Sequence, residues 1–530
     1  MTALVARVAA GPGRASSSGV VVLVGLAALI GLWELAARAM SATYLLAAPS
    51  EVLAYLFENR ALMARNLSIT LGNAAAGFLI GKLAAVLLAM AALSWPRSER
   101  VITSLALLVF CLPFVATGPI LRVFFGPGEW PQIVIAALAV YYTTLIPLLV
   151  GLRAAPASWF DIVRSYGRGR VSALVHVRAM ASLPYFFAGL QIAAPAAFLG
   201  AMVGEFTGAE AGMGVLTIRA MRALDVEMTW AIATISTAVA MLAYLAIGRL
   251  ARAILLEQPP VILATPDPGV ARGGKGIGRH VLVVTALALG IWWGGLALLD
   301  LSPFFAKRPE DVLHALAFAP DAAANRGTLA TALGETAVLL LPGYLVGLAA
   351  GAGLAVLFVL APAAGAVAMP VAVALRSVPI VTTAPLVTLL LGRGATGTVT
   401  LVAIMVFFPT LVACLHGLRQ APGQILDVFD SYGAGPLRRL VQVRIPAMLP
   451  SFFAAARMGV PAAVLAVTVV EWLATGKGIG SLMAMSASLS DYDILWSAVV
   501  IVSVLSALAY AAVGHLERRV LEVYAPEQLG

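Results

Sequence analysis

Charged residues are scarce in this 530-residue chain. Asp, Glu, Lys and Arg together make up 11% of the sequence, whereas a soluble domain usually carries about a quarter. Hydrophobic residues make up 61%, and the mean hydropathy is +0.98. The apolar runs last about 20 residues without alternation, which favours helices over a closed β-barrel. The composition therefore predicts an all-α, polytopic membrane protein.

Cysteine and histidine are also rare, and their spacing does not suggest a site. Cys111 and Cys414 lie in apolar runs, and the five histidines lack the spacing of metal ligands. We see no pairing of a nucleophile with a base. The sequence thus predicts no disulfide, no metal site and no catalytic residue.

A phosphate-binding loop is missing as well. The two Gly-Lys-Gly runs, at 274–276 and 476–478, lack the hydroxyl residue that follows lysine in such a loop. We therefore expect no cofactor and no ATPase site in this chain.

The chain does contain a repeat. Matching residues of the two copies lie a constant 266 positions apart in the sequence, as Tyr166 and Tyr432 do. The segments 161–184 and 427–450 are identical at 12 of 24 positions. The same offset pairs Pro113 with Pro379, Pro119 with Pro385, Glu205 with Glu471 and Gly214 with Gly480. Near the start of the copies the offset falls to 260, which pairs Pro49 with Pro309.

Each copy is predicted to hold six spans, about 12 in all. They are expected near 19–40, 69–93, 99–118, 131–151, 185–207 and 228–250, and near 280–302, 333–360, 366–389, 396–418, 451–473 and 494–513. An even number of spans gives both copies the same orientation, so the repeat is parallel. We expect a first domain at 1–256, a Pro- and Gly-rich linker at 257–280 and a second domain at 281–530.

The formal net charge of +9 is interpreted as a sign of topology, and no nucleic acid partner is expected. Lys and Arg concentrate in the amino-terminal segment, the linker and the two repeated basic segments. The positive-inside rule places these regions in the cytoplasm, together with both termini. The apolar run that starts at Gly19 is expected to be an uncleaved first span.

The repeated basic segments are predicted to form helical elbows on the membrane surface. Pro156 and Pro422 suit a first helical turn, and Gly167 and Gly433 suit left-handed caps. A second short helix would lead to Pro184 or Pro450, where the next span is expected to start. Such an elbow either lies against lipid headgroups or docks on a two-fold symmetric cytoplasmic partner.

The motifs in these elbows resemble the EAA loop of ABC importer permeases. The first copy reads DIVRSYG from Asp161 to Gly167 and the second DVFDSYG from Asp427 to Gly433, with Asp where the family usually has Glu. The second copy continues as VRIPAMLP through Pro446, whereas the first has Met180 at the position of that proline.

Three further stretches are similar to the branch of these permeases that handles nitrate, sulfonates, taurine and some vitamin precursors. They are LRSVPIVTTAPLVTLLLGRG at 375–394, VEWLATGKGIGSLM at 470–483 and the closing span at 493–521. The first copy matches less well, with Phe110 where the second has Arg376.

The resemblance implies a permease of a bacterial inner-membrane importer that works by alternating access. Separate ABC ATPase subunits, two copies, would carry ATP and Mg, and a periplasmic or lipid-anchored binding protein would deliver a small solute, with an anion as one option. The residues that would couple to the ATPase are Asp161, Gly167, Pro184, Asp427, Gly433, Pro446 and Pro450. The alternative is an ion-gradient-driven secondary transporter with parallel six-span repeats, which would not require paired elbows.

The candidates for the solute pathway are charges and prolines inside spans. Lys82 and Arg376 are costly there, so each either attracts an anion or has a structural reason: an acidic neighbour for Lys82, snorkelling for Arg376. Pro113, Pro119, Pro379 and Pro385 free backbone carbonyls that either line the pathway or reflect kinked packing.

Two matched glutamates close spans on the outer side. Glu205 and Glu471 are each followed by a Gly-x-Gly sequence. They are candidates for an outer gate or a docking rim, and the alternative is a helix that simply ends among lipid headgroups.

Overall fold

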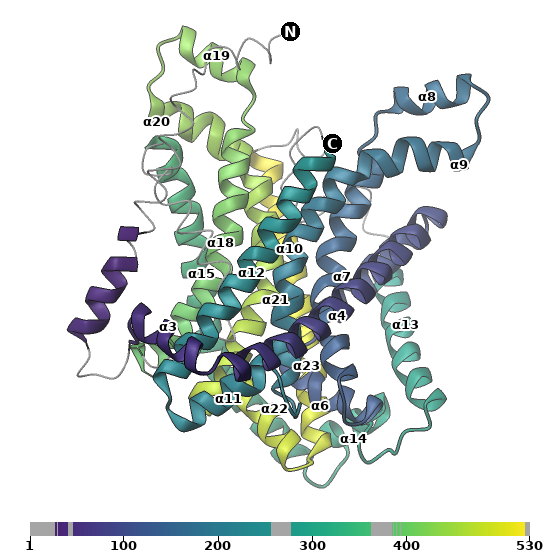
Figure 1. Cartoon of the computed structure of the whole chain (residues 1–530). Coiled ribbons are helices and arrows are strands. Elements are labelled where there is room, and N and C mark those ends of the chain that lie inside the picture. The colour runs from purple at the N-terminus through teal and green to yellow at the C-terminus, as the bar shows by residue number, and fades with distance from the viewer. Residues whose placement is uncertain are drawn as a thin grey trace.

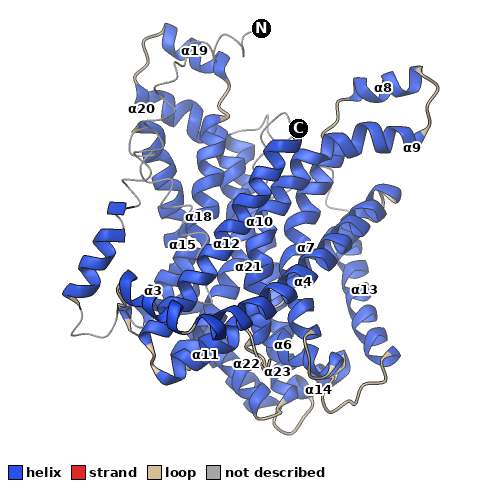
Figure 2. Cartoon of the chain, in the orientation of Figure 1, coloured by secondary structure: helices blue, strands red, loops and turns tan. Residues whose placement is uncertain are grey.

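The structure is a computed structural model that describes residues 27–28, 30–40, 46–255, 277–361, 384, 386–387, 390–392 and 394–524. Every regular element in these ranges is a helix (Figure 2). Nine helical stretches among them are long and apolar enough to cross a membrane. They are α4 (Arg60–Ser94), α7 (Trp130–Arg153), Arg170–Glu205, α12 (Val226–Ile254), α13 (Ile277–Leu298), α15 (Ala322–Leu360), α18 (Ala395–Arg419), Pro436–Thr475 and α23 (Tyr492–Tyr524). The predicted all-α membrane architecture is confirmed.

The third expected span, near 99–118, is a broken helix. It consists of α5 (Glu99–Phe110) and α6 (Phe114–Phe125), which meet at 97°. Pro113 stands directly before α6, where its missing amide hydrogen removes no helical bond. The expected span near 99–118 is therefore broken before Phe114, and its second part continues to Phe125. Most of its counterpart near 366–389, the linker at 257–276 and the segment 1–26 lie outside the described residues.

The repeat is visible in the element order. The elements α7 to α12 recur as α18 to α23: α8 (Ala157–Ser165) as α19 (Gly423–Ser431), α9 (Arg170–Ala173) as α20 (Pro436–Arg439), α10 (Ala179–Glu205) as α21 (Ile445–Val470), and α11 (Met213–Ala223) as α22 (Gly478–Ser488). In Figure 1, α8 and α19 lie at one end of the bundle, the elbow end, and α11 and α22 lie at the opposite, far end. The parallel orientation of the two copies is thereby confirmed.

Two short helices at the far end follow the smaller offset found near the start of the copies. They are α3 (Pro49–Glu58) and α14 (Pro309–Ala317), and each begins with a proline. In each, an acidic side chain of the first turn accepts a hydrogen bond from the residue before the proline, Ala48 to Glu51 and Arg308 to Asp311, both at 2.8 Å.

Within each half, a ridge of small residues allows the long helices to pack closely. Gly77 and Gly81 of α4 lie against α7, and Gly343, Gly347 and Gly351 of α15 lie against α18. A Cβ atom at Gly81 would lie 2.6 Å from the carbonyl oxygen of Ala137. Small residues at such contacts are typical of membrane helices, because backbones must approach closely where water provides no driving force.

Among the described residues, the two halves meet mainly through the broken span. The α6 helix packs against α22 and α21, while α5 packs against α23 and α13. One buried apolar cluster contains residues of both halves, such as Met202 and Val203 of α10 and Val467 and Val470 of α21. The bend therefore directs α6 from the first half towards the second.

Candidate functional site

The turn of each elbow has the geometry that the sequence predicts. Gly167 and Gly433 adopt left-handed φ angles of +67° and +66°. The following amide closes the cap in both copies: Arg168 donates to the Val163 carbonyl at 3.2 Å, and Ala434 to the Phe429 carbonyl at 2.9 Å. Glycine is favoured because it adopts this conformation without steric cost.

The second helix of each elbow does not stop before the next span. It continues through a π-helical turn, Leu174–Arg178 or Leu440–Arg444, directly into α10 or α21. Pro184 and Pro450 lie inside those helices, so the expectation that the spans start there was wrong. A π turn absorbs an extra residue without ending the helix, and a proline bends it locally. Elbow and span are thus one continuous helix.

Each elbow carries exposed apolar side chains on one side of its first helix. Their relative exposures range from 46% to 86%, and their spacing of three and then four residues places them on one helical face. This elbow face consists of Trp159, Ile162 and Tyr166 in the first copy and Ile425, Val428 and Tyr432 in the second. The motif residues Asp161 and Asp427 are exposed nearby. Exposed apolar side chains that gather on one face are typical of a surface that contacts a protein partner or the membrane.

The first elbow is attached to its half by arginines. Arg178 donates to the Leu152 carbonyl at 3.1 Å and lies 5.0 Å from the ring centroid of Phe160 in α8. Beside it, Arg153 forms an ion pair with Glu99, and these groups border a cavity of 290 Å³. The second elbow is held internally, by an ion pair between Arg439 and Asp430.

At the far end, the two matched glutamates cap helices. The buried Glu205 carboxylate accepts hydrogen bonds from the Thr70 hydroxyl and the Gly214 amide, both at 2.7 Å. The buried Glu471 carboxylate accepts one from the Gly480 amide at 2.8 Å. Each thus binds the first turn of α11 or α22, where a negative charge is stabilised by the helix dipole. Both carboxylates act as structural caps in this conformation, and their role in an outer gate stays a prediction.

The Gly-x-Gly sequences after these glutamates are explained by the same contact. The first glycine of each, Gly212 or Gly478, has a φ of +135° or +85°. A side chain on it would collide with the neighbouring carboxylate. Glycine therefore allows the helix end to approach the buried glutamate.

Lys82 is buried between α4 and α7. Its ammonium donates to the Thr144 hydroxyl and lies 4.7 Å from the centroid of the Phe78 ring. In the part of the chain that the structure describes, no carboxylate oxygen lies within 4.0 Å of it, so the acidic neighbour considered above is not found there. Leu348 at the matched position of α15 is also buried. A part for Lys82 in the pathway stays a prediction.

A cavity of 530 Å³ lies between the two halves at the far end, and we name it the interface cavity. Of the predicted pathway residues, Pro119 lines it, and Pro113 sits at the bend that places α6 there. Arg376, Pro379 and Pro385 lie outside the described residues. Lys82 does not line it.

Sequence reasoning missed the side chains that give this cavity its character. They are Arg122 of α6, Phe206 and Trp472 at the ends of the long helices, and Phe305, Ser488 and Tyr492. The offset of 266 could have found two of them, because it pairs Phe206 with Trp472 directly after the matched glutamates.

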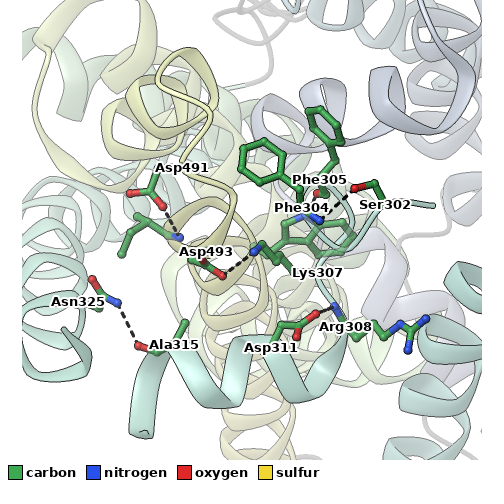
Figure 3. A network of polar contacts seen from close by, with 12 residues as sticks. Ser302, Phe304, Phe305, Lys307, Arg308, Asp311, Ala315, Asn325, Asp491 and Asp493 are labelled. Atoms are coloured by element: carbon green, nitrogen blue, oxygen red, sulfur yellow. Dashed lines mark hydrogen bonds and ion pairs between the residues drawn. The ribbon is translucent and has the colours of Figure 1, made fainter. Parts of the chain in front are cut away.

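A polar network fixes one wall of the cavity (Figure 3). Lys307 forms an ion pair of 3.1 Å with Asp493 at the start of α23, and the Trp496 indole donates to the Phe305 carbonyl at 2.9 Å. These contacts hold the Phe305 ring 5.2 Å from that of Tyr492. The network thus gives the cavity a rigid aromatic side.

Comparison with known proteins gives a family for both halves. The model of the binding-protein-dependent transport system inner membrane component matches residues 77–256 and again 343–522. A probable ABC transporter permease protein of Haemophilus influenzae is 30% identical over 41% of this chain and 90% of its own length. The formylaminopyrimidine transport permease protein ThiX of Halalkalibacterium halodurans is 26% identical over 43% and 91%. The taurine transport system permease protein TauC of Escherichia coli is 23% identical over 44% and 86%. This chain is therefore an integral membrane protein of the binding-protein-dependent transport system inner membrane component family, and it contains that permease domain twice.

Proposed function

We propose that this single chain provides both membrane-spanning halves of an ATP-driven importer. Each relative above aligns over about the length of one half, which is what a fusion of two permease subunits requires. The observation that carries the proposal is the pair of exposed elbow faces at one end of the bundle (Figure 1). Their matched geometry suits a partner with two equivalent clefts.

The partner we propose is a pair of ABC ATPase subunits, one on each elbow, which bind ATP and Mg. The basic residues around the elbows support a cytoplasmic location of this end in a bacterial cell. Within each elbow, Asp161 or Asp427 and Gly167 or Gly433 shape the docking turn. Pro446, Pro184 and Pro450 lie in the helix that leads away from it.

Movement at the elbow would reach the far end through a continuous helix. The stretch Arg170–Glu205 has 36 residues, which corresponds to about 54 Å at 1.5 Å per residue. It ends at Glu205, whose carboxylate caps α11, and the next residue, Phe206, lines the interface cavity. When the ATPase pair closes, the two elbows would approach each other and the long helices would change the width of that cavity. Alternating access follows from this connection.

The solute is proposed to be small and to reach the far end on a binding protein. Two of the relatives are named for formylaminopyrimidine and taurine transport, and both are small solutes. The volume of the interface cavity, 530 Å³, falls within the usual range for small-molecule sites. An ion-gradient mechanism is less well supported, because the matched elbow faces would then have no partner.

The elbow faces can be tested by charge substitution. Ile162→Glu and Val428→Glu each place a carboxylate in a docking face, and removal of a buried interface anchor typically costs about 2 kcal/mol or more, roughly 30-fold in affinity. The full chain, co-expressed with its ATPase, would be purified through a tag on the permease. We expect the double variant to lose the ATPase and ATP-dependent uptake.

The matched control is Leu224→Glu, which changes an exposed apolar residue at the far end. We expect this variant to keep the ATPase. Retention of the ATPase by the double elbow variant, or uptake that follows a proton or sodium gradient without ATP, would refute the proposal.

A further inference from the structure

We propose that the interface cavity is a binding site for a small aromatic or heteroaromatic anion that carries a carboxylate or sulfonate. The inference rests on the proposed function, because it assigns a solute class to the same importer. Four aromatic side chains line the cavity, and they come from both halves: Phe206 from the first, and Phe305, Trp472 and Tyr492 from the second. Such a lining suits a flat apolar body.

The charge of the site comes from Arg122. Among the described residues that line the cavity, Arg122 alone has a charged side chain. Its guanidinium donates to the carbonyls of Gly208 at 2.7 Å and Thr207 at 3.4 Å, both through Nη1. No carboxylate of the described chain lies within 4.0 Å of it. A guanidinium has five N–H donors, so most of them are left for a ligand oxygen.

The backbone beneath Arg122 is shaped to receive it. Gly208 has a φ of +107°, and a Cβ atom there would collide with Nη1 of the arginine. Arg122 also lies in the last turn of α6, where the helix dipole stabilises a cation. The guanidinium is therefore held in place without losing its charge, which is the arrangement that a bidentate anion requires.

Nearby acidic groups do not cancel this charge. Glu205 and Glu471 precede two of the cavity residues, but their carboxylates accept hydrogen bonds from backbone amides at the starts of α11 and α22. Asp493 is paired with Lys307. The Ser488 and Tyr492 side chains add hydroxyl groups that could bind a second polar atom of the solute. An organic cation, in contrast, would meet a fixed positive charge.

Among the described residues that line the site, the positive charge lies on one side only. The offset of 266 pairs Arg122 with Thr388, so the second half lacks the matching cation in its sequence. A solute with one anionic end would thus bind in one orientation, with that end towards α6. A dianion with charges at opposite ends would find one partner and leave the other charge among aromatic rings, which is costly.

The probe we choose is 4-fluorobenzoate, with 4-fluorobenzenesulfonate as its sulfonate analogue. Binding to the full chain in lipid nanodiscs would be followed by broadening of the ¹⁹F signal, without ATPase or binding protein. We expect both anions to bind in the millimolar range. Arg122→Gln should weaken binding by about tenfold, since a charge-assisted bidentate contact is lost. Arg122→Lys should weaken it less, because it keeps the charge but not the planar fork.

The matched control is Arg219→Gln, which removes an exposed arginine of α11 at the same end, away from the cavity. It should bind both anions like the wild type. Trp472→Leu tests the aromatic wall independently of charge, and we expect a loss of severalfold. The thermal stability and elution volume of each variant would be measured first, and binding would be compared among variants that match the wild type in both.

The proposal is overturned if Arg122→Gln and Trp472→Leu bind 4-fluorobenzoate as the wild type does, or if 4-fluorobenzylamine binds equally well. These outcomes are distinct from failure of the proposed function. A chain that binds the anions but does not retain an ATPase refutes the importer and keeps the site. A chain that retains the ATPase but does not bind the anions keeps the importer and refutes the site.

Discussion

Phe206 and Trp472 occupy equivalent positions in the two copies of the repeat, and their rings are in contact. The centroids lie 5.2 Å apart at an interplanar angle of 69°, an edge-to-face arrangement. Residues at equivalent positions of two related halves can touch only close to the axis that relates them. The contact therefore marks this axis at the far end, where it closes one side of the interface cavity.

Cross-linking of this pair tests whether the contact opens during transport. Phe206→Cys and Trp472→Cys would be combined in a chain in which the buried Cys111 and Cys414 are replaced by Ala. We expect a short bifunctional thiol reagent to join the halves and stop ATP-driven uptake, and the yield to fall when the ATPase is trapped with a non-hydrolysable ATP analogue. Chains with one of the two cysteines are the control, and each should show the same uptake before and after this treatment. An unchanged yield in the trapped state would contradict an opening at this contact.

The cap at Glu205 makes a prediction about stability. Glu205→Ala leaves the buried Gly214 amide and the Thr70 hydroxyl without this partner, which costs about 1–3 kcal/mol for an unpaired buried group. Thermal unfolding in nanodiscs should show a lower midpoint. Glu210→Ala, in the exposed loop that follows, is the control and should change stability by less than about 0.5 kcal/mol. Equal midpoints for the two variants would show that the cap is not stabilising.

The repeat and the helical class were predictable from sequence, because they depend on composition and on a constant offset. The 97° bend was not, although Pro113 was noticed, because its angle depends on the packing of α6 against α22. The role of Glu205 as a cap was missed for a similar reason: its partner Thr70 is distant in the sequence. The interface cavity needs residues from both halves, and local patterns carry no information about such contacts.

Substitution of Lys82 separates the effect of this buried cation on stability from its effect on transport. Lys82→Leu places in α4 the residue type that the second half has at Leu348. A cation near the middle of a span costs about 2.5–3.5 kcal/mol on insertion scales, so we expect a higher thermal midpoint. Thr144 retains its hydrogen bond to the Val140 carbonyl at 3.2 Å. If Lys82 serves the pathway, uptake must fall at equal expression, whereas unchanged uptake at equal expression removes it from the pathway.

Arg178 connects the first elbow to its span, so its loss should impair coupling more than docking. Its hydrogen bond to the Leu152 carbonyl and its contact with the Phe160 ring are together worth roughly 2 kcal/mol. We expect Arg178→Gln to keep the ATPase, because the exposed elbow face is unchanged, but to lower uptake per ATP hydrolysed severalfold. Arg168→Gln, at an exposed position of the same turn, is the control and should behave as the wild type. Loss of the ATPase from Arg178→Gln would instead show that this arginine shapes the docking surface itself.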